Sequence, residues 1–188
     1  GVQPVIGSVS IMVPNTVIDE QFTDLVIDGV PFEFMNAAGS EAPAEYIFYL
    51  PQHNALCGAE VVSHTMHNLY TLRGAKVRDA PKWSSDINSM LNEYGTAESF
   101  FGSHHWPIWG RNRIVDFLEK QRDMYRYIHD QTVRWANEGL TPREIAERIK
   151  LPDSLANECY NRDYYGTVSH NSKAVYQFNC GWYDGNPA

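Results

Sequence analysis

The segment from residue 114 to residue 135 carries a long helical pattern that limits how the chain can fold. Its apolar and aromatic residues recur at spacings of three and four, which places them on one face of an α-helix. They are Ile114, Phe117, Leu118, Met124, Tyr125, Ile128 and Trp135. Such a helix would have about seven turns, roughly twice the mean for globular proteins. We therefore expect it to pack along a partner helix or a second subunit.

The first 52 residues have the pattern of strands and turns instead. The dipeptide Asp28-Gly29, a strong hairpin signal, is flanked by the segments 22–28 and 31–34. Residues 5–13 are rich in β-branched side chains, and residues 46–50 form an apolar run that Pro51 ends. We expect strands at all four places.

The rest of the chain changes from mixed to purely helical. Residues 61–72 and 83–94 read as helices that close at glycines, and residues 99–102 read as a short strand. A capping box with Pro at the first helical position begins another helix at Thr141, which we expect to run to Leu151. The pattern predicts an α+β fold, with a boundary near Gly110 between regions 1–110 and 111–188.

The charges are divided unevenly along the chain. The net charge is −8, and all fifteen Lys and Arg residues lie at or after Arg73, whereas eight acids precede it. No basic stripe is present, which argues against a nucleic-acid partner. No apolar run is long enough to span a bilayer, and no signal peptide is visible. The division is either a chance property of a β-rich segment or an acidic, metal-holding part beside a basic cluster.

Two carboxylates lie at or just after expected strand ends. Glu41 and Glu60 are 19 residues apart, and Glu60 follows an apolar stretch where an unpaired charge would be costly. Carboxylates at strand ends can meet at one sheet edge and bind a divalent cation. The alternative for each is an exposed acid or a helix cap, which is the commoner situation for a single residue.

Histidines offer two further candidate metal sites. His104 and His105 follow an expected strand, where one ring can bind zinc while the other orients it or donates a hydrogen bond. Ordinary surface histidines are the alternative. Glu60, His64 and His67 form a competing set, because their i, i+4 and i+7 spacing would place them on one helical face, although the HExxH order is lacking. Otherwise His64 and His67 would support the metal ligands or contact substrate.

Three residues with amide or guanidinium side chains come soon after His67 in the sequence. Asn68, Arg73 and Arg78 surround the glycine that closes the expected helix. Guanidinium forks suit the paired oxygens of carboxylate, phosphate or sulfate, so these residues are candidates for an anion site. A surface salt bridge, such as that between Arg78 and Asp79, is the alternative.

Several of these strings together resemble the alkyl sulfatases of the metallo-β-lactamase superfamily. They are HNLYTLRGAKVRD at residues 67–79, SHHWPIWG at 103–110, MYRYIHDQT at 124–132 and YYGTVSHN at 164–171. The resemblance covers nearly the whole chain and is weakest in residues 1–35. It implies the second half of a metallo-β-lactamase αββα sandwich, followed by an all-α dimerisation domain that forms a homodimer.

The resemblance also implies a role for individual residues. Glu41 matches a ligand of a first zinc ion, Glu60 a carboxylate that bridges two zinc ions, and His105 a ligand of the second. The positions that hold the sulfate group are matched by Asn68, Arg73 and Arg78. His170 matches a histidine that contacts sulfate and protonates the leaving group.

One departure from the family is large. Its main zinc motif, His-x-His-x-Asp-His, does not occur in this sequence, and a two-zinc site needs roughly six or seven protein ligands. We therefore interpret the chain as an internal fragment that is inactive alone. The function implied for the complete protein is hydrolysis of alkyl sulfate esters, such as dodecyl sulfate, in the periplasm or outside the cell. The alternatives are a non-catalytic binding or dimerisation module, or a related hydrolase of phosphate esters or thioesters.

Overall fold

In the part of the chain that the structure describes, six strands form one sheet, and their spatial order follows the chain order. They are β1 (Phe22–Ile27), β2 (Val30–Asn36), β3 (Tyr46–Leu50), β4 (Ala55–Cys57), β5 (Ser99–Phe101) and β6 (Ile108–Trp109). β4 and β5 are parallel, and the other neighbours are antiparallel. These elements come from a computed structural model that describes residue 7, residues 10–183 and residue 185.

The hairpin between β1 and β2 forms where the sequence predicts it. Asp28 and Gly29 both have positive φ, 52° and 82°, and connect the paired residues Ile27 and Val30. Such a turn matches the right-handed twist of the two strands. The strands predicted at residues 46–50 and 99–102 are also confirmed, as β3 and β5.

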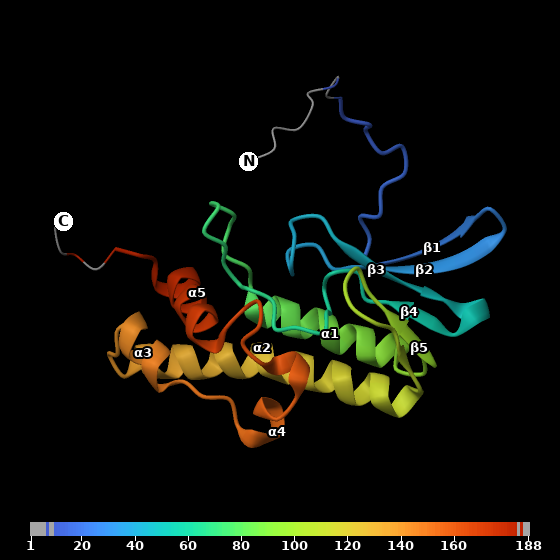
Figure 1. Ribbon diagram of the computed structural model, residues 1–188. Helices are drawn as coiled ribbons and strands as arrows, with labels where there is room; N and C mark the ends of the chain where they lie inside the picture. Colours follow the sequence, from blue (N-terminus) through green and yellow to red (C-terminus); the bar gives the residue numbers. More distant parts are fainter. Residues whose placement is uncertain (1–6, 8–9, 184, 186–188) are drawn as a thin grey trace.

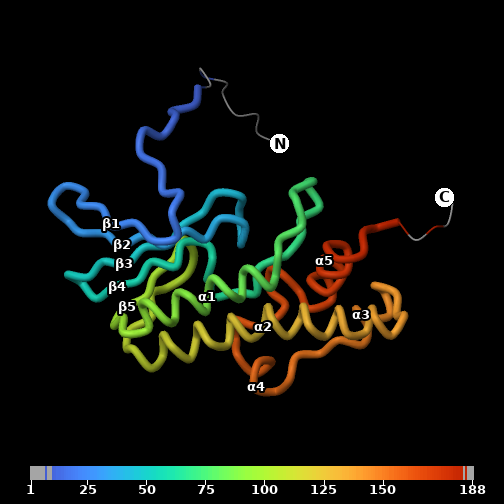
Figure 2. The backbone as a smooth tube through the Cα atoms, turned by 180° about the vertical axis from the view of Figure 1, so that it is seen from behind, coloured from blue at the N-terminus to red at the C-terminus, as the bar shows by residue number. Residues whose placement is uncertain are grey.

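Among the described residues, five α-helices accompany the sheet: α1 (Ala80–Tyr94), α2 (Arg111–Asn137), α3 (Pro142–Arg148), α4 (Asp153–Ala156) and α5 (Val168–Cys180). Two short 3₁₀ turns, η1 (Pro51–His53) and η2 (Cys159–Asn161), complete the described elements. α1 lies along one face of the sheet, and α2 runs beside α1 (Figures 1 and 2) and also contacts β5 and β6. The predicted long helix is therefore confirmed as α2, which packs on partner helices α1 and α5.

The two faces of the sheet differ in what covers them. Met35, Ile47, Leu56 and Phe100 point into the core that α1 and α2 complete. On the opposite face, the rings of four phenylalanines pack against one another, with centroid separations of 5.3–6.0 Å. They belong to Phe32, Phe34, Phe48 and Phe101. A second apolar face is typical of a sheet inside a layered sandwich. The predicted α+β class is confirmed.

The helix predicted over residues 61–72 is wrong. This segment contains turns and irregular backbone instead. Its peptide groups bond to distant parts of the chain: Leu69 O, for example, accepts from Arg78 N at 2.9 Å, and Met66 O accepts from Gly166 N at 2.7 Å. These tertiary bonds replace the i to i+4 bonds of a helix. The periodic helical face that would carry Glu60, His64 and His67 therefore does not exist.

Two smaller differences concern element bounds. The prediction of a strand over residues 5–13 falls partly outside the described residues, and residues 10–13 are not in a strand. Thr141 caps α3 with the predicted capping box, but the helix ends at Arg148 rather than Leu151. Ile149, the residue that follows the helix, has an extended backbone and is 5% exposed. The domain boundary near Gly110 stays a prediction, and one apolar core runs across it.

Candidate metal and anion site

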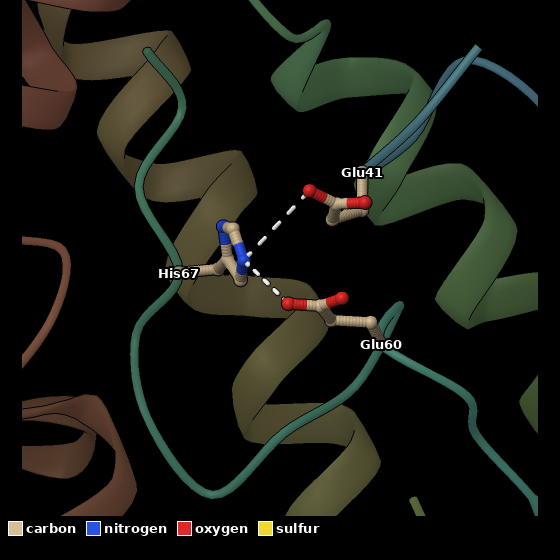
Figure 3. Close-up of side chains that lie close together, drawn as sticks. All are labelled: Glu41, Glu60 and His67. Atoms are coloured by element: carbon tan, nitrogen blue, oxygen red, sulfur yellow. Dashed lines mark hydrogen bonds and ion pairs between the residues drawn. The ribbon is translucent and has the colours of Figure 1, made fainter. Parts of the chain in front are cut away.

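Three side chains from separate segments meet beside the sheet. Glu41 lies in the loop between β2 and β3, Glu60 follows β4, and His67 lies in the irregular segment before α1. Their potential ligand atoms all lie within 4.8 Å of one another. The Nε2 atom of His67 is 3.4 Å from Glu60 Oε1 and 3.9 Å from Glu41 Oε1 (Figure 3). Strand-end placement thus predicted that the two carboxylates converge; their role as ligands stays a prediction.

Arg78 fixes one side of this cluster. All three of its guanidinium nitrogens donate to protein oxygens: to the carboxylate and main-chain carbonyl of Glu41, and to Asn68. The bond to the Asn68 side chain is 2.7 Å long, and that to its carbonyl is 3.0 Å. Arg78 is 9% exposed, so these charge-assisted bonds lie largely out of water. The salt bridge runs to Glu41 and not to Asp79, which instead caps α1.

A second carboxylate shapes the loop that carries Glu41. Glu45 Oε2 accepts from the Ser40 hydroxyl and from the main-chain N–H of Ala42, both at 3.3 Å. Ser40 is 1% exposed and also donates to Ala37 O at 2.7 Å. Burial raises the pKa of Glu45 to about 7, and the neighbouring Glu41 carboxylate adds to the rise. Glu45 therefore binds the residues on both sides of Glu41 and holds the loop in place.

Replacing Glu45 by Gln should stabilise the metal-free complete protein at alkaline pH. Because the folded state holds the Glu45 proton up to about pH 7, stability falls as pH rises from the unfolded pKa through that value. Gln cannot ionise, so the variant should gain about 1–2 kcal/mol at pH 8.5 and almost nothing near pH 4.5. Thermal unfolding at both pH values measures this difference. Glu119→Gln, at an exposed position of α2, is the matched control; equal gains in both variants would contradict the prediction.

A cavity of about 480 Å³ opens beside Glu60 and His67, and His104, His105, Tyr164 and Tyr165 line it with them. His104 Nε2 lies 3.4 Å from Glu60 Oε1. His105 has a left-handed backbone, with φ at 72°, and its ring faces that of His64 at 5.8 Å. The cavity therefore gathers imidazoles around the Glu60 carboxylate.

His64 lies beside this group in a more apolar setting. Its ring stacks on Phe117 of α2, with ring centroids 4.7 Å apart. Burial lowers the pKa of His64, and nearby His105 lowers it further. His64 therefore packs as a largely neutral ring, away from the Glu41–Glu60–His67 cluster.

The structure brings together only some of the residues that the sequence singled out. Asn68 and Arg78 contact each other and Glu41, whereas Arg73 lies exposed and forms no hydrogen bond or ion pair within the described part of the chain. His105 lines the cavity but is not among the three converging donors. His170 lies exposed in the first turn of α5, where its N–H donates to the Thr167 hydroxyl at 2.9 Å. The roles predicted for these residues stay predictions.

The donor set suits a divalent cation. Two carboxylates and one imidazole are hard-to-borderline ligands of the kind that zinc binds, and three protein ligands leave a position open. His67 Nδ1 lies 2.9 Å from the carbonyl of Asn68, which leaves Nε2 facing the carboxylates. These residues fit one ion; two ions would need more ligands than this cluster offers.

Comparison with known proteins identifies relatives over nearly the whole chain. The alkyl/aryl-sulfatase BDS1 of Saccharomyces cerevisiae is 50% identical over 183 residues, which are 97% of this chain and 28% of that protein. A linear primary-alkylsulfatase from a Pseudomonas species is 48% identical over 97% of this chain and 27% of its own length. The chain is similar to alkyl sulfatases over nearly its whole length. It spans little more than a quarter of the length of these relatives.

Two further comparisons agree with this similarity. The family named "Alkyl sulfatase dimerisation" matches residues 141–188, which contain α3, α4 and α5. The solved structure of the stereoselective inverting sec-alkylsulfatase Pisa1 from Pseudomonas sp. superposes with a TM-score of 0.90 at 42% identity. That match covers 93% of this chain and 28% of the Pisa1 chain. The alkyl sulfatase fold predicted from the sequence is confirmed.

Sequence reasoning gave too little weight to several residues at the site. His67 was expected on a helix, yet it converges with the two carboxylates from an irregular segment. Glu45, Tyr125 and Asn171 were not expected to act at the site. The available signal for Glu45 was a second acid four residues after Glu41 in a loop. Tyr125 and Asn171 offered none, because their partners lie 58 to 104 residues away in the chain.

Proposed function

We propose that the complete protein hydrolyses alkyl sulfate esters to an alcohol and sulfate at a zinc-dependent site. The observation that carries this proposal is the convergence of Glu41, Glu60 and His67 beside the Arg78–Asn68 pair. Acid and imidazole ligands thus lie next to guanidinium and amide donors. Hydrolysis of an anionic ester needs both, a cation and donors that hold the anion. The names of the relatives, alkyl/aryl-sulfatase and primary alkylsulfatase, support the substrate class.

The residues of this chain would divide the work as follows. Glu41, Glu60 and His67, together with the predicted ligand His105, would hold zinc, which when bound lowers the pKa of water toward neutrality. Asn68 and Arg73 would donate to the sulfate oxygens and stabilise the charge that builds on the departing sulfate. Arg78, already bonded to Glu41 and Asn68, would keep both in place. His170 would give its proton to the alcohol oxygen. A second zinc ion, bridged by Glu60, is part of the proposal.

We further propose that the helical region forms a homodimer. Residues 141–188 match the dimerisation family. The same part of the chain exposes Phe178, Trp182 and Tyr183, and a hollow of about 670 Å³ lies between α3 and α5. Exposed apolar surface of this kind is typical of an interface. Among the described residues, no helix is both long and apolar enough to cross a bilayer. A periplasmic or secreted location is proposed from the family resemblance alone.

Turnover of two matched esters tests the proposed activity. The complete, zinc-loaded protein should release sulfate from dodecyl sulfate. It should release phosphate from dodecyl phosphate much more slowly or not at all. Preferential phosphate release would favour another ester hydrolase of the superfamily. Absence of turnover with either ester, in protein shown by elemental analysis to hold zinc, would favour a binding or dimerisation module. Ion chromatography of the released anions measures both reactions.

A further inference from the structure

The main chain around Asn68 is attached to the helical region at three points. The N–H of His67 donates to the hydroxyl of Tyr125 in α2 at 3.1 Å. The carbonyl of Met66 accepts from the N–H of Gly166 at 2.7 Å. Asn171 in α5 makes two bonds: its Nδ2 donates to His67 O and its Oδ1 accepts from Leu69 N–H, both at 2.9 Å. The side chain of Asn171 therefore bridges the peptide groups on both sides of Asn68.

These bonds are made out of water. Asn171 and Tyr125 are each 1% exposed. The segment forms no helix or strand, so its peptide groups depend on such partners, and an unsatisfied buried group would cost about 1–3 kcal/mol. Asn171 supplies one donor and one acceptor in the geometry of a neighbouring peptide. The two side chains thus fix a conformation that residues 66–69 do not fix themselves.

Close packing also connects residues 66–69 with the helical region. A Cβ added at Gly166 would lie 2.4 Å from His67 O and 2.8 Å from Asn68 N, so only glycine lets the two main chains approach this closely. The ring of Tyr125 stacks on Trp83, with centroids 4.7 Å apart, and Tyr165 meets the His67 ring edge-on at 5.0 Å. The helical region therefore contacts His67 through both its backbone and its ring.

We infer that Asn171 and Tyr125 are positioning residues for the proposed site. By holding the main chain on either side of Asn68, they aim the His67 imidazole at Glu41 and Glu60 and keep the Asn68 amide beside Arg78. The helical region, of which residues 141–188 match the dimerisation family, thus also builds the candidate site. The functional part of this inference rests on the proposed function, whereas the attachment itself does not.

Two buried asparagines allow a matched test in the complete protein. Asn161 is also 1% exposed, but its side chain bonds only to Leu155 O and Gln121, both within the helical region. Asn161→Ala and Asn171→Ala therefore each remove a buried amide with two partners. Only the second variant frees residues 66–69. Both should lower the unfolding temperature.

Hydrogen exchange of the Leu69 amide is the first measurement. Asn171→Ala should speed that exchange by about tenfold or more, since the amide loses its acceptor, and Asn161→Ala should leave it unchanged. Unchanged exchange in Asn171→Ala, or equal acceleration in both variants, would overturn the attachment. This measurement needs neither zinc nor substrate.

The second measurement is the binding of inorganic sulfate, followed by calorimetry. Asn171→Ala should weaken it by about tenfold, as is typical when a residue that orients a binding group is lost. Asn161→Ala should not change it. Equal losses in both variants, or no loss in Asn171→Ala, would overturn the positioning role. Wild-type protein that binds no sulfate, together with faster Leu69 exchange in the variant, would refute the proposed function and retain the attachment.

Tyr125→Phe provides an independent variant that keeps the aromatic stack on Trp83. It removes only the hydroxyl, so the core should stay filled while the His67 N–H loses its acceptor. The His67 amide should exchange about tenfold faster and sulfate binding should weaken. Tyr127→Phe is the control, because its hydroxyl donates to Lys150 O at the far side of α2. The same response in both variants would argue against the inference.

Discussion

Replacing Glu60 by Gln in the complete protein is expected to remove bound zinc and abolish hydrolysis of alkyl sulfates. The Glu60 carboxylate lies 3.4 Å from the imidazoles of both His67 and His104, and it borders the cavity. Gln keeps the size and loses the negative charge that a cation needs at that place. Its amide nitrogen would also meet the imidazoles as a donor. A zinc titration should show the affinity lowered by at least about 100-fold, and elemental analysis should show less bound zinc per chain.

The control and the readouts separate a metal role from a structural one. Glu119→Gln makes the same chemical change at an exposed position of α2 and should leave zinc content and turnover of dodecyl sulfate unchanged. Unfolding of metal-free Glu60→Gln should match that of the wild type, because the Glu60 side chain is 36% exposed. A variant that retains stoichiometric zinc and full turnover would refute the ligand role of Glu60.

The fold was largely predictable because its signals are local. The hairpin at Asp28-Gly29, the short run at residues 46–50 and the amphipathic pattern of α2 each depend on residues that are neighbours in the sequence or three to four positions apart. The exception is the segment 61–72. Its predicted helical pattern is local, but its peptide groups find better partners in α2, in α5 and at Arg78. Bonds made across 58 or 102 residues leave no periodic trace in the sequence.

The candidate site also contains residues that local sequence signals predicted and residues whose place depends on distant contacts. The position of Glu41 and Glu60 at strand ends predicted their convergence, because the sheet itself brings those ends together. The third donor, His67, depends on the fold of the irregular segment, so its spacing of seven residues from Glu60 suggested a helical face that does not exist. Arg78 was identified as a residue for an external anion, yet its nitrogens are occupied by Glu41 and Asn68. Burial and competing internal partners cannot be read from spacing.

Arg78→Ala should therefore act differently from Arg73→Ala, although the sequence suggested the same role for both. Removing Arg78 leaves the Glu41 carboxylate largely buried without its counter-charge, which typically costs about 3–5 kcal/mol. The Glu41 side chain is 13% exposed, so water can compensate only in part. Zinc affinity and stability should both fall, because Glu41 and Asn68 lose the group that joins them. Arg73 is exposed and forms no such bonds among the described residues, so its removal should leave stability and zinc content unchanged while weakening sulfate binding.

Arg78→Lys decides whether charge alone explains the effect. Lysine keeps the positive charge near Glu41, but a single ammonium cannot reach the carboxylate, the Glu41 carbonyl and Asn68 together. If the planar fork matters, Lys should recover part of the stability and little of the sulfate affinity, since Asn68 stays unanchored. Thermal unfolding, elemental analysis and sulfate calorimetry on the three variants give the comparison. Full recovery of stability and sulfate affinity in Arg78→Lys would mean that Arg78 acts only as a counter-charge. Loss of zinc in Arg73→Ala would instead make Arg73 the structural residue and reverse the assignment.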